Sequence, residues 1–238
     1  MYKQIIRKSI KDIFDNYHYL LKVLLIPSLL LIAISYYLLN NPVEDKIAGF
    51  VLNFVSAFIN VLIAVSVHRV ILLGHESVPR WGLIPSSREI RFIGIYIGLV
   101  LLIALISGIL VAILGTVINK MVLIALLILA FLPIFSRLSM VFPAISIDKP
   151  MTLRESWDET RGYTFLILIT LIVFPVLFSL VFGIIYGLAL KLLTWMISPQ
   201  LQALEALINV VISVFVVSAL SSTYYYIVSN KEVLEEME

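Results

Sequence analysis

Cysteine is absent from this chain of 238 residues, and histidine and charged residues are scarce. Without cysteine, the chain can form no disulfide, no thiolate metal site and no cysteine nucleophile. The three histidines, His18, His68 and His75, are too few to favour a multi-histidine metal site. The sequence also contains no recognisable phosphate-binding loop, dinucleotide-binding fingerprint or serine triad. We therefore expect no catalytic residue, no metal, no cofactor and no nucleic-acid partner.

Charged residues make up 13% of the chain and apolar residues 61%, whereas soluble domains contain about 25% and about 45–50%. The apolar residues recur in runs of about twenty, which is the length that crosses the hydrocarbon core of a bilayer. The pattern predicts an all-α integral membrane bundle of about six transmembrane helices in a single domain, residues 1–230. The expected spans are about 20–39, 47–67, 92–118, 121–136, 163–190 and 201–228, with the second interrupted at His68 and Arg69.

Both ends of the chain are expected outside the spans. Residues 1–18 place isoleucines at helical spacing opposite Lys3, Arg7, Lys8 and Lys11. This pattern is typical of an interfacial amphipathic helix that lies on an anionic leaflet. Residues 231–238, KEVLEEME, are interpreted as an acidic cytoplasmic tail.

Basic residues are distributed unevenly between the two sides of the six spans. Of the 17 Lys and Arg, only Lys46, Lys120 and Lys191 fall on the side opposite to the N-terminus. Because cytoplasmic loops carry the excess of Lys and Arg, both termini are predicted to be cytoplasmic. Tyr17 would then lie in the aromatic belt of the inner interface, and Trp195 in that of the outer one.

Three segments on the predicted cytoplasmic side resemble one another: residues 9–15, 86–92 and 152–158. Each begins with Ser or Thr, continues with a base and an acid, and ends near an aromatic or apolar residue. The hydroxyl group can cap a helix N-terminus, and the acid complements the helix dipole. The similarity favours a threefold repeat of an interfacial helix followed by a transmembrane hairpin. Amphipathic interfacial helices can also share this pattern by chance, and the sequence leaves both interpretations open.

The most distinctive sequence lies within residues 137–162. Its characteristic residues are Arg137, Leu138, Ser139, Val141, Phe142, Pro143, Ala144, Thr152, Leu153, Arg154, Glu155, Ser156, Trp157, Thr160, Arg161 and Gly162. Over these residues the chain resembles a widespread group of uncharacterised bacterial integral membrane proteins, akin to YciC-type inner-membrane proteins and to the membrane domains of some glycerophosphodiester phosphodiesterases. The phosphodiesterase's catalytic barrel has no counterpart here, so its activity is not implied. The resemblance implies a six-helix protein of the bacterial inner membrane that is linked to envelope maintenance.

Five residues on the predicted cytoplasmic side are candidates for binding lipid headgroups or partner proteins: Arg69, Arg137, Arg154, Trp157 and Arg161. Arg69 and Arg137 each follow a span and precede further apolar residues, and a charge inside the membrane boundary suggests a functional site. The competing interpretation is that each arginine simply snorkels to the phosphate layer. If Arg69 and Arg137 converge, they can bind a headgroup or pair with one of three acids: Glu89, Glu155 or Asp158.

The last of the three similar segments is predicted to form a helix that starts near Thr152. On it, Arg154, Trp157, Asp158 and Arg161 would share one face, with Trp157 anchored at the interface and Arg154 paired with Asp158. The basic side chains on this face would then meet the headgroups together.

Two of the predicted spans carry polar stripes. The second has Asn53, Ser56 and Asn60 at helical spacing, and the sixth has Glu205, Asn209 and Ser213. Such stripes can line a polar pathway, in which a buried Glu205 would be a candidate proton or cation site. The competing interpretation is that they form hydrogen bonds between helices and hold the spans together.

Taken together, these features favour a non-enzymatic membrane protein that supports envelope organisation by binding lipid headgroups or partner proteins through its cytoplasmic segments. A transporter of small solutes or lipids that uses the polar stripes is one alternative, and a membrane subunit of a larger complex is another. Membrane lipids are the expected partners and other membrane proteins are a second candidate, while the oligomeric state is left open.

The predicted topology can be tested with reporter fusions. A reporter fused after Lys120 should behave as periplasmic, and one fused after Asp148 should behave as cytoplasmic, because only this orientation satisfies the distribution of Lys and Arg. Finding either reporter on the other side would refute the orientation.

Overall fold

The computed structural model describes residues 2–41, 46–78, 85–116, 118–149 and 151–235. These residues form helices and short connections, and no strand occurs among them. Six of the helical segments are long and apolar enough to cross a membrane. The prediction of an all-α membrane bundle with six spans is therefore confirmed.

The helical elements follow one another along the chain with short links. They are α1 (Tyr2–Asp15), α2 (Tyr17–Asn40), α3 (Lys46–Leu73), η1 (His75–Ser77), α4 (Ser87–Leu114), α5 (Lys120–Leu138), α6 (Val141–Ser146), α7 (Leu153–Glu159), α8 (Thr164–Leu168), the π-helical turn η2 (Ile169–Val173), α9 (Phe174–Met196), η3 (Pro199–Leu204) and α10 (Glu205–Glu235).

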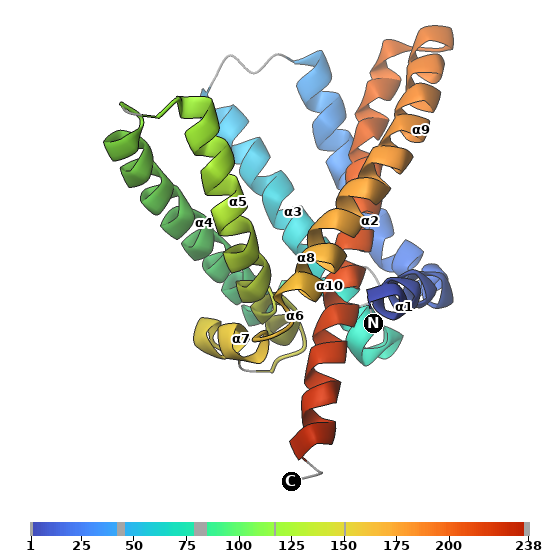
Figure 1. Ribbon diagram of the computed structural model, residues 1–238. Helices are drawn as coiled ribbons and strands as arrows, with labels where there is room; N and C mark the ends of the chain where they lie inside the picture. Colours follow the sequence, from blue (N-terminus) through green and yellow to red (C-terminus); the bar gives the residue numbers. More distant parts are fainter. Residues whose placement is uncertain (1, 42–45, 79–84, 117, 150, 236–238) are drawn as a thin grey trace.

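The bundle has two arms that meet at one end (Figure 1). One arm is the α4–α5 hairpin, and the other contains α2, α9 and α10; α3 packs on α2 and α10 and also touches α4 and α6. In the last span 44% of the most apolar stretch is buried, whereas in α4 the share is 6%. The α4–α5 arm is thus held mainly where the two arms meet and stands apart from the rest of the bundle elsewhere.

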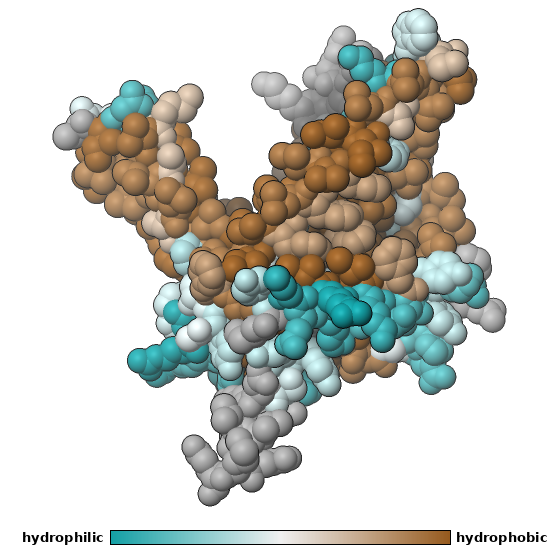
Figure 2. All heavy atoms as spheres, turned by 45° about the vertical axis from the view of Figure 1, so that its right-hand side comes forward, coloured by the Kyte–Doolittle hydropathy of each residue, from teal (hydrophilic) through white to brown (hydrophobic). Residues whose placement is uncertain are grey.

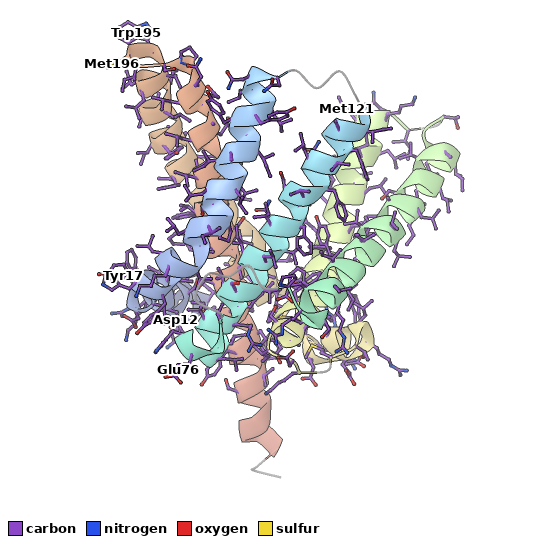
Figure 3. All side chains as sticks on the ribbon, turned by 180° about the vertical axis from the view of Figure 1, so that it is seen from behind. Asp12, Tyr17, Glu76, Met121, Trp195 and Met196 are labelled. Atoms are coloured by element: carbon purple, nitrogen blue, oxygen red, sulfur yellow. The ribbon has the colours of Figure 1, made fainter. Side chains whose placement is uncertain are left out.

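The end where the arms meet carries α1, η1, α6 and α7 (Figure 1). We call it the basic end, because Arg69, Arg88, Arg137, Arg154 and Arg161 lie there. In the space-filling view a hydrophilic band surrounds this end, while both arms above it are hydrophobic (Figure 2). Tyr17 lies at the basic end and Trp195 at the opposite one (Figure 3), which agrees with the expected aromatic belts. A hydrophilic band at one end and hydrophobic arms above it are the arrangement expected of a helical bundle in a bilayer.

Several boundaries differ from the sequence prediction. The interruption at His68 and Arg69 is wrong, because α3 runs unbroken to Leu73. Protein partners, described below, satisfy both side chains, so the helix does not need to stop there. The last two spans are longer than expected: α9 reaches Met196, and α10 continues through Glu235. Of the predicted acidic tail, residues 236–238 lie outside the described residues.

The first helix does more than cover a membrane surface. Ile5, Ser9 and Ile13 of α1 form a buried stripe, and this stripe packs against α10. Ser9 is therefore in the middle of a helix and its expected role as an N-cap is wrong. The corresponding residues Ser86 and Thr152 do cap α4 and α7, each in a reciprocal capping box with the acid three residues later. The threefold repeat itself stays a prediction.

Buried hydroxyl groups on α10 connect it to three other elements. Ser218 exchanges hydrogen bonds with Ser9 of α1, at 3.1 Å between the two Oγ atoms and 3.0 Å to the Ser9 carbonyl oxygen. Ser221 Oγ lies 2.7 Å from Nδ1 of His68 on α3, and Thr223 Oγ1 lies 3.0 Å from Thr170 Oγ1 in η2. Hydrogen bonds of this kind align membrane helices that apolar packing alone leaves free to rotate and slide.

The Ser9–Ser218 contact can be measured with a double-mutant cycle of Ser9→Ala and Ser218→Ala. We expect a coupling free energy of about 0.6–1.7 kcal/mol in the stability of the reconstituted protein, the range found for hydrogen bonds between membrane helices. The matched control pairs Ser9→Ala with Ser179→Ala, since the Ser179 hydroxyl bonds the Val176 carbonyl of its own helix. Equal coupling in the two cycles would show that α1 is not held by this contact.

Candidate functional site

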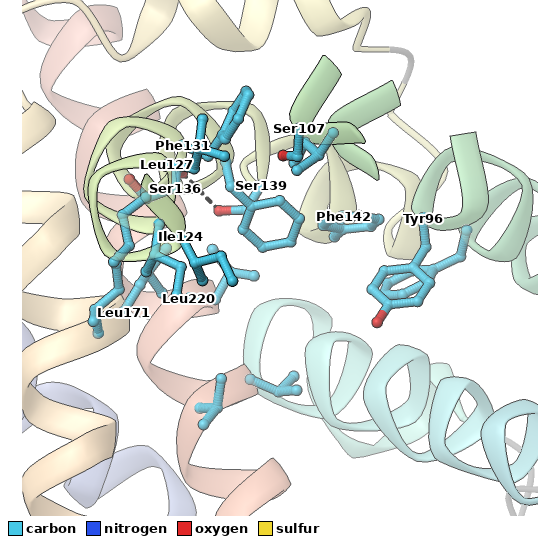
Figure 4. A pocket seen from close by; sticks show the side chains of 18 of the residues that line it. Tyr96, Ser107, Ile124, Leu127, Phe131, Ser136, Ser139, Phe142, Leu171 and Leu220 are labelled. Carbon is cyan, nitrogen blue, oxygen red and sulfur yellow. Dashed lines mark hydrogen bonds between the residues drawn. The ribbon is translucent and has the colours of Figure 1, made fainter. Parts of the chain in front are cut away.

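A cavity of about 600 Å³ lies between the two arms (Figure 2). Side chains from α3, α4, α5, α6, η2 and α10 line it, and most of them are apolar. Figure 4 shows Phe131, Ile124 and Leu220 around the same space, with Phe142 and Tyr96 continuing the wall. The volume lies in the range of pockets that hold a small ligand, about 300–1,000 Å³. No Asp, Glu, Lys or Arg of the described chain lines this space, and its surface is largely apolar.

Five of the lining residues carry a polar group in the side chain: His68, Tyr96, Ser107, Ser136 and Ser139. The Ser136 hydroxyl donates to the Pro133 carbonyl oxygen at 3.0 Å, and the Ser139 hydroxyl donates to the Ser136 carbonyl oxygen at 2.7 Å (Figure 4). His68 is only 1% exposed, and its Nε2 has no hydrogen-bond partner among the described residues. Leaving such a buried polar atom unsatisfied typically costs about 1–3 kcal/mol. His68 is therefore the exceptional polar group of the cavity.

His68 and Ser221 have the separation of a base and a nucleophile, but their setting does not favour catalysis. Ser221 is fully buried, is not among the residues that line the cavity, and its hydroxyl is also placed to donate to the Val217 carbonyl oxygen at 2.9 Å. A nucleophile must reach the atom that it attacks. The contact between the two side chains joins α3 to α10.

Helix α6 closes the cavity toward the basic end. All six of its residues are buried, and it packs on α3, α4 and α10. Phe142 lines the cavity, whereas the carbonyl oxygen of Ser146 accepts a hydrogen bond from Arg69. Helix α6 therefore lies between the Arg69 guanidinium and the apolar space.

Arg69 connects three segments at the basic end. Its Nε donates to the Ser77 carbonyl oxygen at 2.9 Å, and one terminal nitrogen donates to the Ser146 carbonyl oxygen at 2.9 Å and to Asp148 at 3.0 Å. Arg88 binds the other oxygen of Asp148, also at 3.0 Å. Partial burial raises the pKa of Asp148, but the hydrogen bonds and charges of Arg88 and Arg69 outweigh this effect and hold that pKa below its usual value.

Arg137 fastens the end of α5 to α7. Its Nε donates to Thr160 Oγ1 at 3.0 Å, a terminal nitrogen donates to the Trp157 carbonyl oxygen, and the guanidinium lies 3.6 Å from the centre of the Trp157 ring. In return, the Ser156 hydroxyl donates to the Arg137 carbonyl oxygen at 2.7 Å. Arg69 and Arg137 thus have separate sets of partners, and among the described contacts Arg137 pairs with none of the three acids considered from the sequence.

The remaining predicted residues of this segment are more exposed. Arg154 and Asp158 do pair, at 3.9 Å, but their side chains are 93% and 67% exposed, so the pair contributes little. The expectation that Arg161 shares their helical face is wrong, since α7 ends at Glu159 and the chain turns at Gly162 with φ of 86°. At the start of α7 the backbone amide of Thr152 donates to Glu155, which lowers the pKa of this carboxyl group.

The polar stripes of the second and sixth spans meet in part. Asn60, Glu205 and Asn209 line one small pocket of about 240 Å³ together with residues of α2, whereas Asn53 does not. The side-chain amides of Asn53 and Asn60 donate to carbonyl oxygens of their own helix, at 2.9 Å each. These two asparagines therefore form hydrogen bonds within α3 and not the expected ones between helices. Hydrogen bonds between helices are formed instead by hydroxyl groups of α10.

Comparison of the chain with protein-family models, curated proteins and solved structures finds no match. The resemblance of residues 137–162 to bacterial inner-membrane proteins accordingly stays a prediction. Sequence reasoning missed the cavity and the contacts of His68, because an apolar residue that faces a cleft has the same hydropathy as one that faces lipid. The one available signal was a histidine inside an apolar run.

The role of Arg137 can be tested with Arg137→Lys, which keeps the charge but loses the planar group that stacks on Trp157. We expect the opening free energy of α7, measured by hydrogen exchange of its backbone amides, to fall by about 1–2 kcal/mol, and retained lipid to decrease. Arg137→Ala should act in the same direction and more strongly. Arg154→Lys is the control and should leave both readouts unchanged. If Arg137→Ala alters neither α7 exchange nor membrane insertion nor bound lipid, Arg137 merely snorkels.

Proposed function

We propose that this membrane-spanning protein binds lipid, with an apolar chain of the lipid lying in the cleft between the α4–α5 arm and the rest of the bundle. The observation that carries the proposal is the cavity of about 600 Å³ with its apolar walls. The hydrophobic surfaces of both arms stand where the acyl chains of a bilayer would be (Figure 2). Because the acyl chains of lipids surround such surfaces, a lipid chain can enter the cleft directly from the bilayer.

A transmembrane helix of another subunit fits the cleft less well. A helix with its side chains is about 10 Å wide and rises about 1.5 Å per residue, so even the whole empty space between the lining residues, about 1430 Å³, would hold only about twelve residues. A spanning helix needs about 20 residues. Interfaces between membrane helices are also rich in small residues, whereas large side chains such as Phe131, Leu127 and Ile124 dominate this wall. These two arguments favour a lipid over a partner helix.

The basic end supports the same proposal, because it offers positive charges to lipid headgroups. Arg154 and Arg161 are exposed there and can meet anionic headgroups, while Arg69 and Arg137 hold the segments that present them. With the basic end in the cytoplasmic leaflet of a bacterial inner membrane, the protein would act without catalysis, as a lipid-binding component of envelope organisation.

Transport of a small polar solute is a second candidate function. It is favoured by the pocket in which Asn60, Glu205 and Asn209 converge from two spans that are distant in sequence. This pocket has less than half the volume of the apolar cavity, and Glu205 already accepts a hydrogen bond from Gln202 at 3.2 Å. The apolar cleft therefore gives the stronger basis for a function.

The lipid-binding proposal can be tested by filling the cleft with Ser107→Trp, because Ser107 lies on the α4 wall of the cavity. We expect the variant to insert normally and to lose most of the lipid that remains bound to the purified wild-type protein, as measured by native mass spectrometry. The control is Leu105→Trp, on the same helix at a position that is 63% exposed and outside the cavity. Equal lipid retention in both variants and the wild type would refute the proposal.

A further inference from the structure

One side chain of the cavity wall has a buried polar atom without a hydrogen-bond partner in the described chain. His68 Nε2 has no hydrogen-bond partner there, although the side chain is almost completely buried and belongs to the cavity wall. The other ring nitrogen lies 2.7 Å from Ser221 Oγ, and this contact fixes the plane of the ring. The hydroxyl groups of Ser136 and Ser139 already donate to carbonyl oxygens, so they do not create the same demand.

We propose that His68 binds the polar head of the lipid in the cleft, and that this head is an uncharged oxygen, either a carbonyl or a hydroxyl group. The inference rests on the proposed function, since it assumes that an apolar chain occupies the cavity. It adds the chemical class of the ligand: a neutral lipid whose oxygen lies at the inner end of the cleft instead of among the charged headgroups.

The surroundings of His68 favour a neutral head over a charged one. No Asp, Glu, Lys or Arg is among the residues described around the cavity, whose ionisable side chains are His68 and the phenol of Tyr96, and an unpaired charge in such a site is strongly disfavoured. The α6 layer also separates the cavity from Arg69, so a phosphate at the basic end cannot share the site with His68. His68 stands five residues before the end of α3, which places it about 8 Å inside the helix end.

Water is a poor substitute for such a ligand. A buried water molecule needs two to four polar partners, and the hydroxyl groups of Ser136 and Ser139 already donate their protons to carbonyl oxygens. The proton of Ser221 decides which oxygen fits. If the Ser221 hydroxyl donates to the Val217 carbonyl oxygen, His68 Nε2 is an acceptor and requires a hydroxyl group; if it donates to His68, Nε2 carries the proton and also accommodates a carbonyl group.

The test compares three probes of equal chain length in detergent micelles: hexadecane, 1-hexadecanol and 2-hexadecanone. Native mass spectrometry measures how much of each probe the purified protein binds at a fixed mole fraction in the micelle. We expect at least one oxygen-bearing probe to bind about tenfold more tightly than hexadecane, the effect of one good hydrogen bond to a group otherwise left unsatisfied. Preference for the alcohol alone assigns Nε2 as an acceptor, and binding of the ketone assigns it as a donor.

Variants separate this inference from the proposed function. His68→Leu should remove the preference for oxygen while hexadecane still binds, and His68→Gln, which keeps a hydrogen-bonding group, should retain part of the preference. Leu105→Trp serves as the control and should bind all three probes like the wild type. If the wild type binds the three probes equally, the role of His68 is refuted whether or not the variants fold. If it binds none of them, and Ser107→Trp also leaves co-purified lipid unchanged, lipid binding in the cleft is refuted as well.

Discussion

Hydrogen bonds between the hydroxyl groups of α10 and its neighbours are the contacts on which the rest of this bundle depends. In a bilayer, apolar side chains gain little by leaving lipid for protein, so packing alone does not fix which helices meet. Hydrogen bonds of Ser218, Ser221 and Thr223 specify which elements meet, because their partners lie on α1, α3 and η2. The π-helical turn places Thr170 next to Thr223, and Pro175, whose nitrogen has no proton to donate, lies two residues beyond its end. The hydroxyl groups between Ser218 and Thr223 thereby join α10 to α1, α3 and η2.

Among the described residues, the α4–α5 arm shows no comparable set of side-chain hydrogen bonds to other helices along its length. It is fastened near the basic end, where Phe92 packs on Phe142 with ring centres 4.6 Å apart and Arg137 holds α7. Farther from that end, both helices present large apolar residues to the cavity or to lipid. The cleft is therefore a consequence of where the polar contacts are: attachment at one end leaves the two arms separated by a space with largely apolar walls.

The spans and the overall class could be predicted because a run of about twenty apolar residues has few alternatives in water or in lipid. The capping of α4 and α7 also followed from local sequence, since Ser86 and Thr152 need only the acid three residues later. The continuity of α3 could not be predicted, because the partner of His68 is 153 residues away in sequence. The separate partners of Arg69 and Arg137 could not be predicted either, because they depend on where α6 and α7 pack at the basic end. The cleft was equally hidden, as hydropathy does not distinguish a cavity wall from a surface that faces lipid.

The most direct measurement asks whether lipid chains enter the cleft in a bilayer. The chain contains no cysteine, so Ser107→Cys can carry a single small fluorophore without removal of native thiols. In vesicles that contain phospholipids with a nitroxide on the acyl chain, the label at this position should be quenched as strongly as one introduced with Leu105→Cys on the lipid-facing side of α4. A label introduced with Arg154→Cys at the basic end should be quenched much less. Quenching of the Ser107 label as weak as that of the Arg154 label would mean that the arms close on each other, or on another helix, and would contradict a lipid-filled cleft.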